Sequence, residues 1–368
     1  MPSRKRHISS FLHSFGKTIL TTLQILAVAM LLCCAASVYI SPHSYSFLSI
    51  LTLGFPFLLA LTIIIGLLAL LFTPRRSWIT LLGLLLCSGS IRNYCPVNLP
   101  AAPPDSAWHV MTWNMGGTKW DDDLTRDSIR AYLANEQLDL LVVQEISSPH
   151  ADTLAACLRS RMPYSAFNGD SQWYGHAIIS RWPVLGSEKL TASGGNRAVL
   201  YQLQMPEGDT LFVISCHLQS MHLDHNVRSD YSAIVHRQET NRDSVQQTSE
   251  TLLQHIKENG ALRALQADTV AQFLRAHADS RIIVAGDLND SPVSYTRQTI
   301  AEAAPLTDCF RASGNGIGRS FNSDAIYVRI DHLFCTENFF KPYQCRLGNT
   351  HISDHYPLHC RLMPVSGK

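Results

Sequence analysis

The first 104 residues of this 368-residue chain contain no aspartate or glutamate, although they hold seven lysines and arginines. The first carboxylate is Asp105, and the remaining residues carry 23 basic and 29 acidic side chains. Charged residues make up 16% of the chain, against roughly a quarter in an average soluble domain. This composition excludes a disordered chain and a strongly basic nucleic-acid coat. It divides the chain into an apolar, weakly basic front and an acidic back.

The ten cysteines contain no CxxC pair, which argues against a structural zinc site, and the chain is too long for a disulfide miniprotein. Seven cysteines lie beyond the apolar runs of the front, so at least one is a free thiol unless two chains pair. Cys216, in the apolar run LFVISC, is predicted to be a small buried side chain. The cysteines therefore do not identify the compartment.

The front contains three apolar runs, at about residues 18–40, 47–72 and 77–94. The first two are uncharged and can span ~30 Å of hydrocarbon at ~1.5 Å per residue. The third is short and spans only if Arg92 lies at the interface. We therefore expect residues 1–95 to form a membrane anchor of three transmembrane helices. The alternatives are a cleaved signal peptide for the first run and a buried or re-entrant helix for the third.

The basic residues of the front predict its orientation. They gather in the N-terminal SRKRH and in the turn TPRRS at 73–77, whereas the turn at 41–46 has none. Both basic segments are expected on the cytoplasmic side. Three crossings place everything after Asn93 on the opposite side of the membrane, and two crossings would leave the large domain in the cytoplasm.

Residues 96–104 (PVNLPAAPP) are typical of a semi-extended linker. Residues 105–368 alternate short apolar runs with helical or turn-rich stretches, as in α/β proteins. Runs such as LLVV, LFVI and IIVA indicate strands covered on both faces. Residues 223–277 form a polar insert, in which we expect two amphipathic helices broken near Gly260. We favour a surface cap for this insert over a lid or a segment lying on the bilayer.

Several apolar strands end directly in an acid, amide or imidazole. An α/β protein places its ligands and catalytic groups outside such strand ends. Taken singly, each of these residues also fits an ordinary turn or a satisfied strand end. The set is Asn114, Glu145, His217, Asp287, Asn289, Asp331, Asp354 and His355.

The strings around these residues are TWNM, VVQE, YGHAIISRWPV, ISCHLQS, VAGDLND, RIDHLFCT and SDHYPL. In this order and spacing, residues 108–362 resemble the endonuclease/exonuclease/phosphatase superfamily, which includes DNase I, abasic-site endonucleases, inositol-polyphosphate 5-phosphatases and neutral sphingomyelinases. The resemblance implies a DNase I-like, four-layer sandwich of two mixed β-sheets flanked by helices over residues 105–368. Bacterial members often carry a short multi-pass anchor, which implies a bacterial inner-membrane protein with a periplasmic catalytic domain.

The resemblance also implies a hydrolase that uses Mg²⁺, or alternatively Mn²⁺. Glu145 would be the first metal ligand, with Asn114 and Asp354 completing that site. Asp287 and Asn289 would position and activate the attacking water, or hold a second metal. This donor set suits a phosphodiester, because a hard cation with oxygen ligands neutralises the anionic substrate before attack.

The same resemblance assigns proton-transfer roles. His355 would contact the phosphate and assist proton transfer, oriented by Asp331. His217 would stabilise the phosphate or protonate the leaving oxygen. Arg197 can bind a phosphate oxygen or form an ordinary salt bridge. Gly116 departs from the family, because several nucleases carry an acid there that gives the first metal a second carboxylate.

We therefore expect a membrane-anchored, metal-dependent phosphoesterase that acts on phosphodiesters or phosphomonoesters. The alternatives are a nuclease acting on DNA or RNA, a sphingomyelinase-like lipid phosphodiesterase, and a catalytically silent binding domain on a membrane tether. The acidic excess of the back argues against a processive nuclease, which needs several phosphate contacts from lysine or arginine. The expected partners are a phosphate-ester substrate and the lipid bilayer, and no protein partner is inferred.

Overall fold

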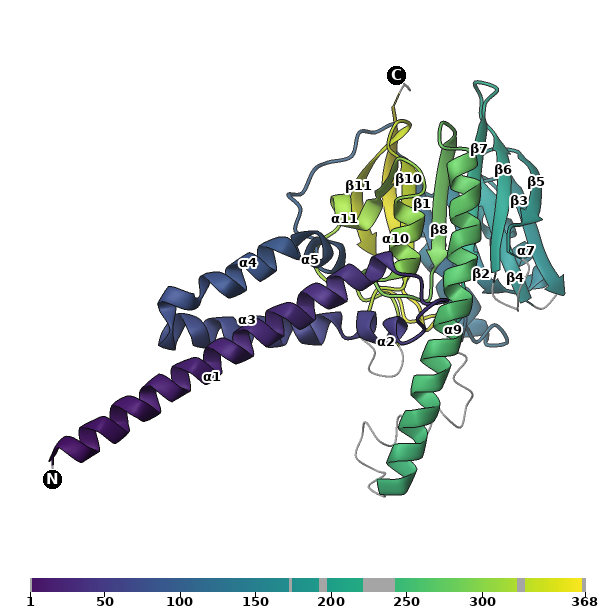
Figure 1. The fold of residues 1–368 in the computed structure, drawn as a ribbon. Coiled ribbons are helices and arrows are strands. Elements are labelled where there is room, and N and C mark those ends of the chain that lie inside the picture. The colour runs from purple at the N-terminus through teal and green to yellow at the C-terminus, as the bar shows by residue number, and fades with distance from the viewer. Residues whose placement is uncertain (1, 172–173, 192–196, 221–241, 323–327, 366–368) are drawn as a thin grey trace.

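Two six-stranded sheets form the back of the chain in the computed structural model, which describes residues 2–171, 174–191, 197–220, 242–322 and 328–365. The first sheet has the order β11-β12-β1-β2-β4-β3 and the second β5-β6-β7-β8-β10-β9 (Figure 1). The first contains β1 (Trp108–Asn114), β2 (Leu140–Ile146), β3 (Tyr164–Ser171), β4 (Tyr174–Ser180), β11 (Phe340–Leu347) and β12 (Leu358–Pro364). The second contains β5 (Val184–Lys189), β6 (Arg197–Gln204), β7 (Thr210–His217), β8 (Arg281–Asp287), β9 (Leu306–Asp308) and β10 (Asp331–Thr336).

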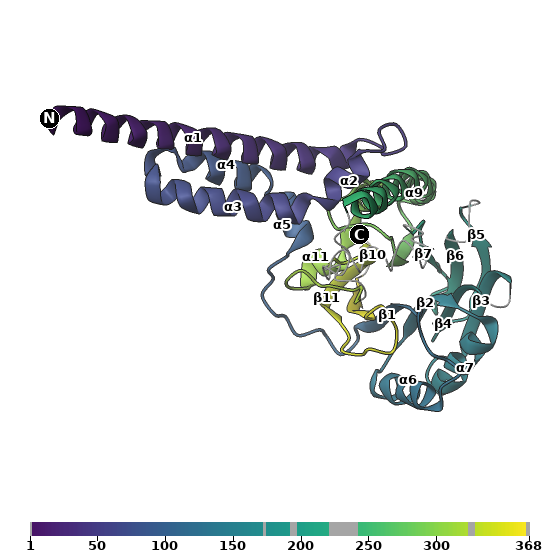
Figure 2. The ribbon, with the colours of Figure 1, turned by 90° about the horizontal axis from the view of Figure 1, so that it is seen from below.

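The apolar runs are buried on both faces because alternate side chains enter different cores. In β2, Leu140 and Val142 face the second sheet, whereas Leu141 and Val143 face helices α6 (Asp123–Asn135) and α7 (Ser148–Leu158). On the outer face of the second sheet, the core is closed by α9 (Arg242–Ala276) and α10 (Tyr295–Ala301). Two mixed sheets flanked by helices form the expected DNase I-like sandwich (Figure 2).

Strand pairing brings the polar strand ends to one edge of the sandwich. Parallel pairing of β1 with β2 sets Asn114 opposite Gln144, one residue before Glu145. Parallel pairing of β7 with β8 sets His217 opposite Asp287, and antiparallel pairing of β10 with β8 sets Asp331 opposite the same residue. The carboxyl end of β8 is therefore the point at which the candidate residues of the second sheet meet.

The front forms a helical bundle that projects from the sandwich. It contains α1 (Pro2–Ala36), the 3₁₀ turn Ser37–Tyr39, α2 (Leu48–Leu53), α3 (Phe55–Phe72), the 3₁₀ turn Pro74–Arg76, α4 (Trp78–Leu86), α5 (Ser88–Tyr94) and no strand. Helix α1 runs towards the sandwich, α3 runs back beside it, and α4 returns (Figures 1 and 2). Gln24 holds the bundle together through its Nε2, which donates to Thr80 Oγ1 at 2.9 Å and to the Arg76 carbonyl at 3.1 Å.

Two helices of the described chain are long and apolar enough to cross a membrane, Ser14–Tyr39 with 26 residues and Phe55–Phe72 with 18. The third apolar run does not form the single helix expected over about 77–94. It is divided at Cys87 into α4 and α5, of nine and seven residues. The run Cys87-Ser88-Gly89-Ser90 explains the division, because these residues are weak helix formers.

The insert expected at 223–277 differs from its prediction. Residues 223–241 lie outside the described residues, and the remainder is one continuous helix, α9, that passes through Gly260 without a break. Gly260 is needed for close packing, because a Cβ there would lie 2.0 Å from Ser49 Oγ of α2. A glycine that costs helix propensity thus permits contact between α9 and the front.

The linker at 96–104 has no helix or strand, and the Leu99 side chain is 95% exposed. Its first residues are nevertheless fixed to the sandwich. The Pro96 carbonyl accepts from Gly316 N at 2.9 Å, and Asn98 Nδ2 donates to the carbonyls of Arg311 and Gly314. In addition, Arg329 donates to the Asn93 carbonyl at 2.6 Å. The front is therefore joined to the sandwich by hydrogen bonds as well as by the chain.

His109 of β1 and His359 of β12 form a buried imidazole pair, with their ring nitrogens 3.1 Å apart and His359 also 2.7 Å from Tyr132 Oη. Burial, Arg361 and Arg346 lower the pKa of His109 to about 4, and burial and Arg346 lower the pKa of His359 to about 2. Since the unfolded pKa is about 6.5, protonation favours the unfolded chain.

We expect the stability from this pair to be complete above pH 6.5 and to fall by ~6 kcal/mol, about half of it from each imidazole, as the pH drops towards 4. Thermal unfolding of the full chain in detergent, followed by tryptophan fluorescence between pH 7 and 4.5, measures the effect. His359→Gln should flatten the pH dependence, and substitution of the exposed His351 by Gln should not. Equal slopes in both variants would contradict the assignment.

Candidate active site

The centre of the site is a group of three side chains from three strand ends. Ligand atoms of Glu145, His217 and Asp287 all lie within 4.8 Å of one another. His217 Nε2 is 3.2 Å from Glu145 Oε1 and 3.9 Å from Asp287 Oδ2. Asn114 Nδ2 joins the two carboxylates, donating to Glu145 Oε1 at 2.8 Å and to Asp287 Oδ2 at 3.1 Å. The sandwich thus brings together residues that are up to 173 positions apart in the chain.

His355 and Asp331 form a buried pair beside this group. His355 Nδ1 is 2.8 Å from Asp331 Oδ2, and its Nε2 faces Asp287 Oδ2 at 3.8 Å. Burial opposes protonation of His355, but Asp331 outweighs it and raises the pKa of the imidazole to about 10. The pairing with Asp331 therefore favours the protonated imidazole, whose Nε2 faces the centre of the site.

Asp287 is a deeply buried acid of the site, with 1% of its surface exposed, as is Asp331. Burial and the neighbouring Asp331 raise the pKa of Asp287 to about 8, against an opposing effect of His355. Asn289 holds the carboxylate through its backbone N–H at 2.7 Å and its Nδ2 at 3.2 Å. A carboxylate in this state is stabilised in its ionised form by any added positive charge.

Backbone strain is concentrated at the site. Three non-glycine residues of the described chain have a positive φ, and two of them are Glu145 at 53° and Asn289 at 52°. The left-handed conformation costs of order 1 kcal/mol at such residues and persists where the surrounding structure holds it in place. Here it directs both side chains out of their strand ends.

Asp354 lies on the other side of the turn Gly116–Gly117. A Cβ at Gly116 would lie 2.5 Å from Glu145 Oε2, and one at Gly117 would lie 3.3 Å from Asp354 Cγ. Ser353 Oγ binds this turn to the rest of the site: its single hydroxyl proton is shared between the carbonyls of Asn114 and Gly116, each at 2.8 Å, and its oxygen accepts from His355 N at 3.1 Å. Gly116 therefore lets the Glu145 carboxylate lie directly against the backbone of this turn, where a Cβ would collide with it.

Two candidate residues have different partners from those expected. Arg197, at the start of β6 and opposite His217 in register, forms an ion pair with Asp170, so the salt-bridge alternative describes this structure. Asn114 directs its Nδ2 at Glu145 and Asp287, while its Oδ1 accepts from Gly116 N. In this arrangement Asn114 bridges the carboxylates, and its role as a metal ligand stays a prediction.

Sequence reasoning missed Tyr174 and Ser353. Tyr174 Oη is 2.9 Å from His217 Nδ1 and fixes the ring that faces Glu145. Each is the first residue of a string that carries the resemblance, YGHAIISRWPV or SDHYPL, but a tyrosine that starts a strand and a serine before an acid are ordinary residues there. Their function depends on pairings between distant strand ends, which a local pattern does not reveal.

The donor set fits a divalent cation. Carboxylate oxygens of Glu145 and Asp287 converge within 4.8 Å together with an imidazole nitrogen, and hard cations such as Mg²⁺ and Mn²⁺ take oxygen ligands. A second group of ligating type in the described chain, His109, Glu136 and His359, lies at the opposite end of β1.

Comparison with known proteins agrees with the geometry. A family model described as the endonuclease/exonuclease/phosphatase family matches residues 111–355, and a domain family of unknown function matches residues 17–94. No curated protein matches the chain.

Three solved structures are similar to the sandwich, and one of them reaches a TM-score of 0.50. The human Nocturnin catalytic domain with bound sulfate is 15% identical, with a TM-score of 0.50 over 72% of this chain and 97% of that one. A humanised D. rerio TDP2 is 19% identical, with a TM-score of 0.49 over 70% and 100%. The 3′ phosphatase NExo from Neisseria is 16% identical, with a TM-score of 0.47 over 70% and 100%. At these identities the likeness concerns the fold alone.

Replacing Ser353 by alanine should destabilise the chain by about 1–3 kcal/mol, because two backbone carbonyls and one N–H lose a buried partner. Ser128→Ala is a matched control, since its hydroxyl is exposed on α6 and its loss should change stability by at most ~0.5 kcal/mol. Denaturant unfolding of the full chain in detergent compares the two. Equal stability of both variants would show that the Ser353 contacts do not hold the turn.

Proposed function

Because the chain belongs to the endonuclease/exonuclease/phosphatase family, we propose that it is a membrane-anchored hydrolase that cleaves phosphodiester bonds with the help of a divalent metal ion. The observation that carries this proposal is the convergence of Glu145, His217 and Asp287 within 4.8 Å, next to the Asp331–His355 pair. A silent binding domain has no need to maintain two strained backbone positions and a buried carboxylate at one point.

Glu145 and Asp287 would hold the cation, with Asn289, Asn114 and Asp354 nearby in the roles that the family resemblance suggests. When bound, the cation neutralises phosphate oxygens and makes the phosphorus more open to attack by water. Mg²⁺ is the proposed ion and Mn²⁺ the alternative, because the donors are mainly oxygens. Asn289 supports the carboxylate of Asp287 by two hydrogen bonds and so fixes where that acid meets the attacking water.

The histidines would bind the charged phosphate oxygens and transfer protons. His355 is held cationic by Asp331 and presents Nε2–H to the site, where it can bind a phosphate oxygen and transfer a proton. His217, fixed by Tyr174, lies on the other side of Asp287 and can protonate the leaving oxygen. Two imidazoles on either side of one carboxylate suit a reaction in which water attacks and an alkoxide leaves.

Phosphodiesters of lipids or nucleic acids are the proposed substrates. The acidic excess after residue 104 disfavours a processive nuclease, and tethering to a bilayer favours lipid phosphodiesters or their headgroups. Parallel assays on single- and double-stranded DNA, RNA, sphingomyelin, phosphoinositides and nucleotides, each with Mg²⁺ and with EDTA, separate these classes.

The direction of the bundle supports the proposed topology. The basic turn at 74–76 lies at the end of α3 that is remote from the sandwich, and α1 starts at that same end (Figures 1 and 2). Helices α4 and α5 then return the chain to the sandwich. With basic segments in the cytoplasm, this path favours a catalytic domain on the periplasmic side of a bacterial inner membrane. The division of the third run at Cys87 makes α4–α5 the segment on which this proposal depends.

Substituting Glu145 by Gln or Asp287 by Asn should lower the hydrolysis of bis(p-nitrophenyl) phosphate by the full chain at least ~100-fold, because each removes a charged ligand. EDTA should abolish the activity, and Mg²⁺ or Mn²⁺ should restore it. Glu188→Gln is the matched control, since Glu188 is exposed on β5. Activity that survives EDTA and both site substitutions would refute the proposal.

A reporter pair fused after Lys368 tests the topology. Alkaline phosphatase is active only in the periplasm and should be active at this position, whereas green fluorescent protein exported in an unfolded state should stay dark. Fusion after residue 76 is the control and should give the opposite pattern. A fluorescent fusion after Lys368 would mean that α4–α5 does not cross and that the catalytic domain is cytoplasmic.

A further inference from the structure

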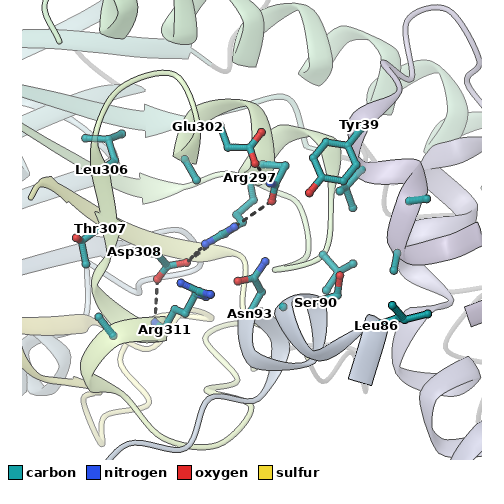
Figure 3. A pocket seen from close by; sticks show the side chains of 18 of the residues that line it. Tyr39, Leu86, Ser90, Asn93, Arg297, Glu302, Leu306, Thr307, Asp308 and Arg311 are labelled. Carbon is teal, nitrogen blue, oxygen red and sulfur yellow. Dashed lines mark hydrogen bonds and ion pairs between the residues drawn. The ribbon is translucent and has the colours of Figure 1, made fainter. Parts of the chain in front are cut away.

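A cavity of about 580 Å³ lies at the seam between the helical front and the sandwich, away from the candidate active site. Tyr39 and Asn93 line it from the front, and Arg297, Asp308 and Arg311 line it from the sandwich (Figure 3). Its two walls differ in chemistry. The front contributes mainly apolar or small side chains, namely Leu32, Ala35, Ala36, Val38, Leu86 and Gly89.

The sandwich wall contains a guanidinium that the protein does not satisfy. Arg297 is fully engaged, donating to Asp308 Oδ2 at 2.9 and 3.2 Å and to Gln298 Oε1 at 3.2 Å. Arg311 meets Asp308 only through its backbone N–H, and its Nε is buried with no hydrogen-bond partner in the described chain. Its side chain points across the cavity towards Asn93 (Figure 3).

Among the charged lining residues that are not fully exposed, two guanidinium groups, Arg297 and Arg311, face one buried carboxylate, Asp308. Arg92 and Arg329 lie outside the lining but act on Arg311 and Asp308, respectively. Burial opposes ionisation of Asp308, but Arg297, His332 and Arg329 lower its pKa to about 2. Burial lowers the pKa of Arg311, and Arg297 and Arg92 lower it further. Two further lining acids, Glu302 and Glu337, are exposed, where water screens them.

The cavity also lies where the chain would leave a bilayer. It adjoins Tyr39, at the end of the first apolar segment, and Asn93, near the end of α5. The Tyr39 side chain is 66% exposed, as is common for aromatic residues at a membrane interface. A ligand here would have its polar part against arginines and its apolar part against the front helices.

We propose that this cavity binds the phosphate headgroup of a membrane phospholipid, with the phosphate on Arg311 and the acyl chains along the wall of Leu32 and Leu86. The proposal rests on the membrane anchoring proposed above, and it is independent of the hydrolytic reaction. Arginine suits this role because its planar guanidinium binds phosphate oxygens in pairs. The apolar wall favours a lipid over free phosphate, which would leave that wall in contact with water.

The test uses the full chain, purified in dodecyl maltoside and stripped of lipid, with thermal unfolding followed by tryptophan fluorescence. Phosphatidylglycerol should raise the unfolding midpoint by about 5 °C, through binding to the folded state. Arg311→Gln should lose more than half of this shift. Arg159→Gln is the matched control, an exposed arginine on the far side of the sandwich, and it should keep the whole shift.

A second variant covers the case in which Arg311→Gln fails to fold. A Cβ added at Gly89 meets nothing within 4 Å, so Gly89→Phe places a ring in the cavity from the front while leaving the arginines unsubstituted, and it should also abolish the shift. The proposal is overturned if both variants respond to phosphatidylglycerol like the wild type. It is also overturned if inorganic phosphate alone reproduces the lipid shift, because the site would then not be a lipid site.

Two readouts on the same preparations separate this inference from the proposed function. Resistance of the chain to alkaline carbonate extraction from membranes tests the anchoring. EDTA-sensitive hydrolysis of bis(p-nitrophenyl) phosphate tests the enzyme, and Arg311→Gln should leave it unchanged because Arg311 lies outside the candidate active site. A chain that is extracted by carbonate refutes the anchor, whereas an integral, active chain without a lipid shift refutes only the lipid site.

Discussion

The buried carboxylate of Asp287 is the group on which the arrangement of the site depends. An acid with 1% exposure is costly unless hydrogen bonds and charges replace water. The structure supplies them from four directions: the amides of Asn289 and Asn114, the imidazole of His355 and that of His217. Asn114 and His217 end β1 and β7, Asn289 follows β8, and His355 precedes β12, so the pairing of the strands determines the site as much as the side chains do. The sandwich is a rigid scaffold, and the site is formed by the side chains at its strand ends.

Helix α9 connects this site with the front. Its Arg263 side chain donates to the Gln219 carbonyl at 2.6 Å and to Asp290 at 3.2 Å, and Gln266 accepts from Gln219 N. Gln219 follows His217 by two residues, and Asp290 directly follows Asn289, so α9 holds the loops that leave both strands. The same helix contacts α2 at Gly260. The segment that seemed to be a surface cap is therefore a support shared by the candidate active site and the helical bundle.

Much of the fold was predictable because its strands are apolar runs that end abruptly in polar residues, as in LLVVQE and IIVAGDLND. The candidate residues were predictable for the same reason, since the strand ends of an α/β sheet face one edge. Contacts between distant segments of the chain were not predictable from the sequence. The sequence does not show that Tyr174 hydrogen-bonds His217 or that Asp170 forms an ion pair with Arg197. Nor does it show that Asn114 directs its Nδ2 towards Glu145. Gly260 looked like a helix break, and its close approach to Ser49 explains why a glycine stands inside a continuous helix.

The hydrogen bonds that hold the start of the linker against the sandwich limit how the domain can meet its substrate. The bonds from Arg329 to Asn93 and from Asn98 to the end of α11 (Cys309–Ser313) leave the sandwich little freedom to swing about residues 96–104. For an enzyme held this way at a bilayer, the mouth of the site keeps a constant height and tilt. The rate at which the site meets a membrane-borne substrate is then set by lateral diffusion in the plane of the bilayer. A domain on a flexible linker would in addition have to reorient before its site faced the substrate.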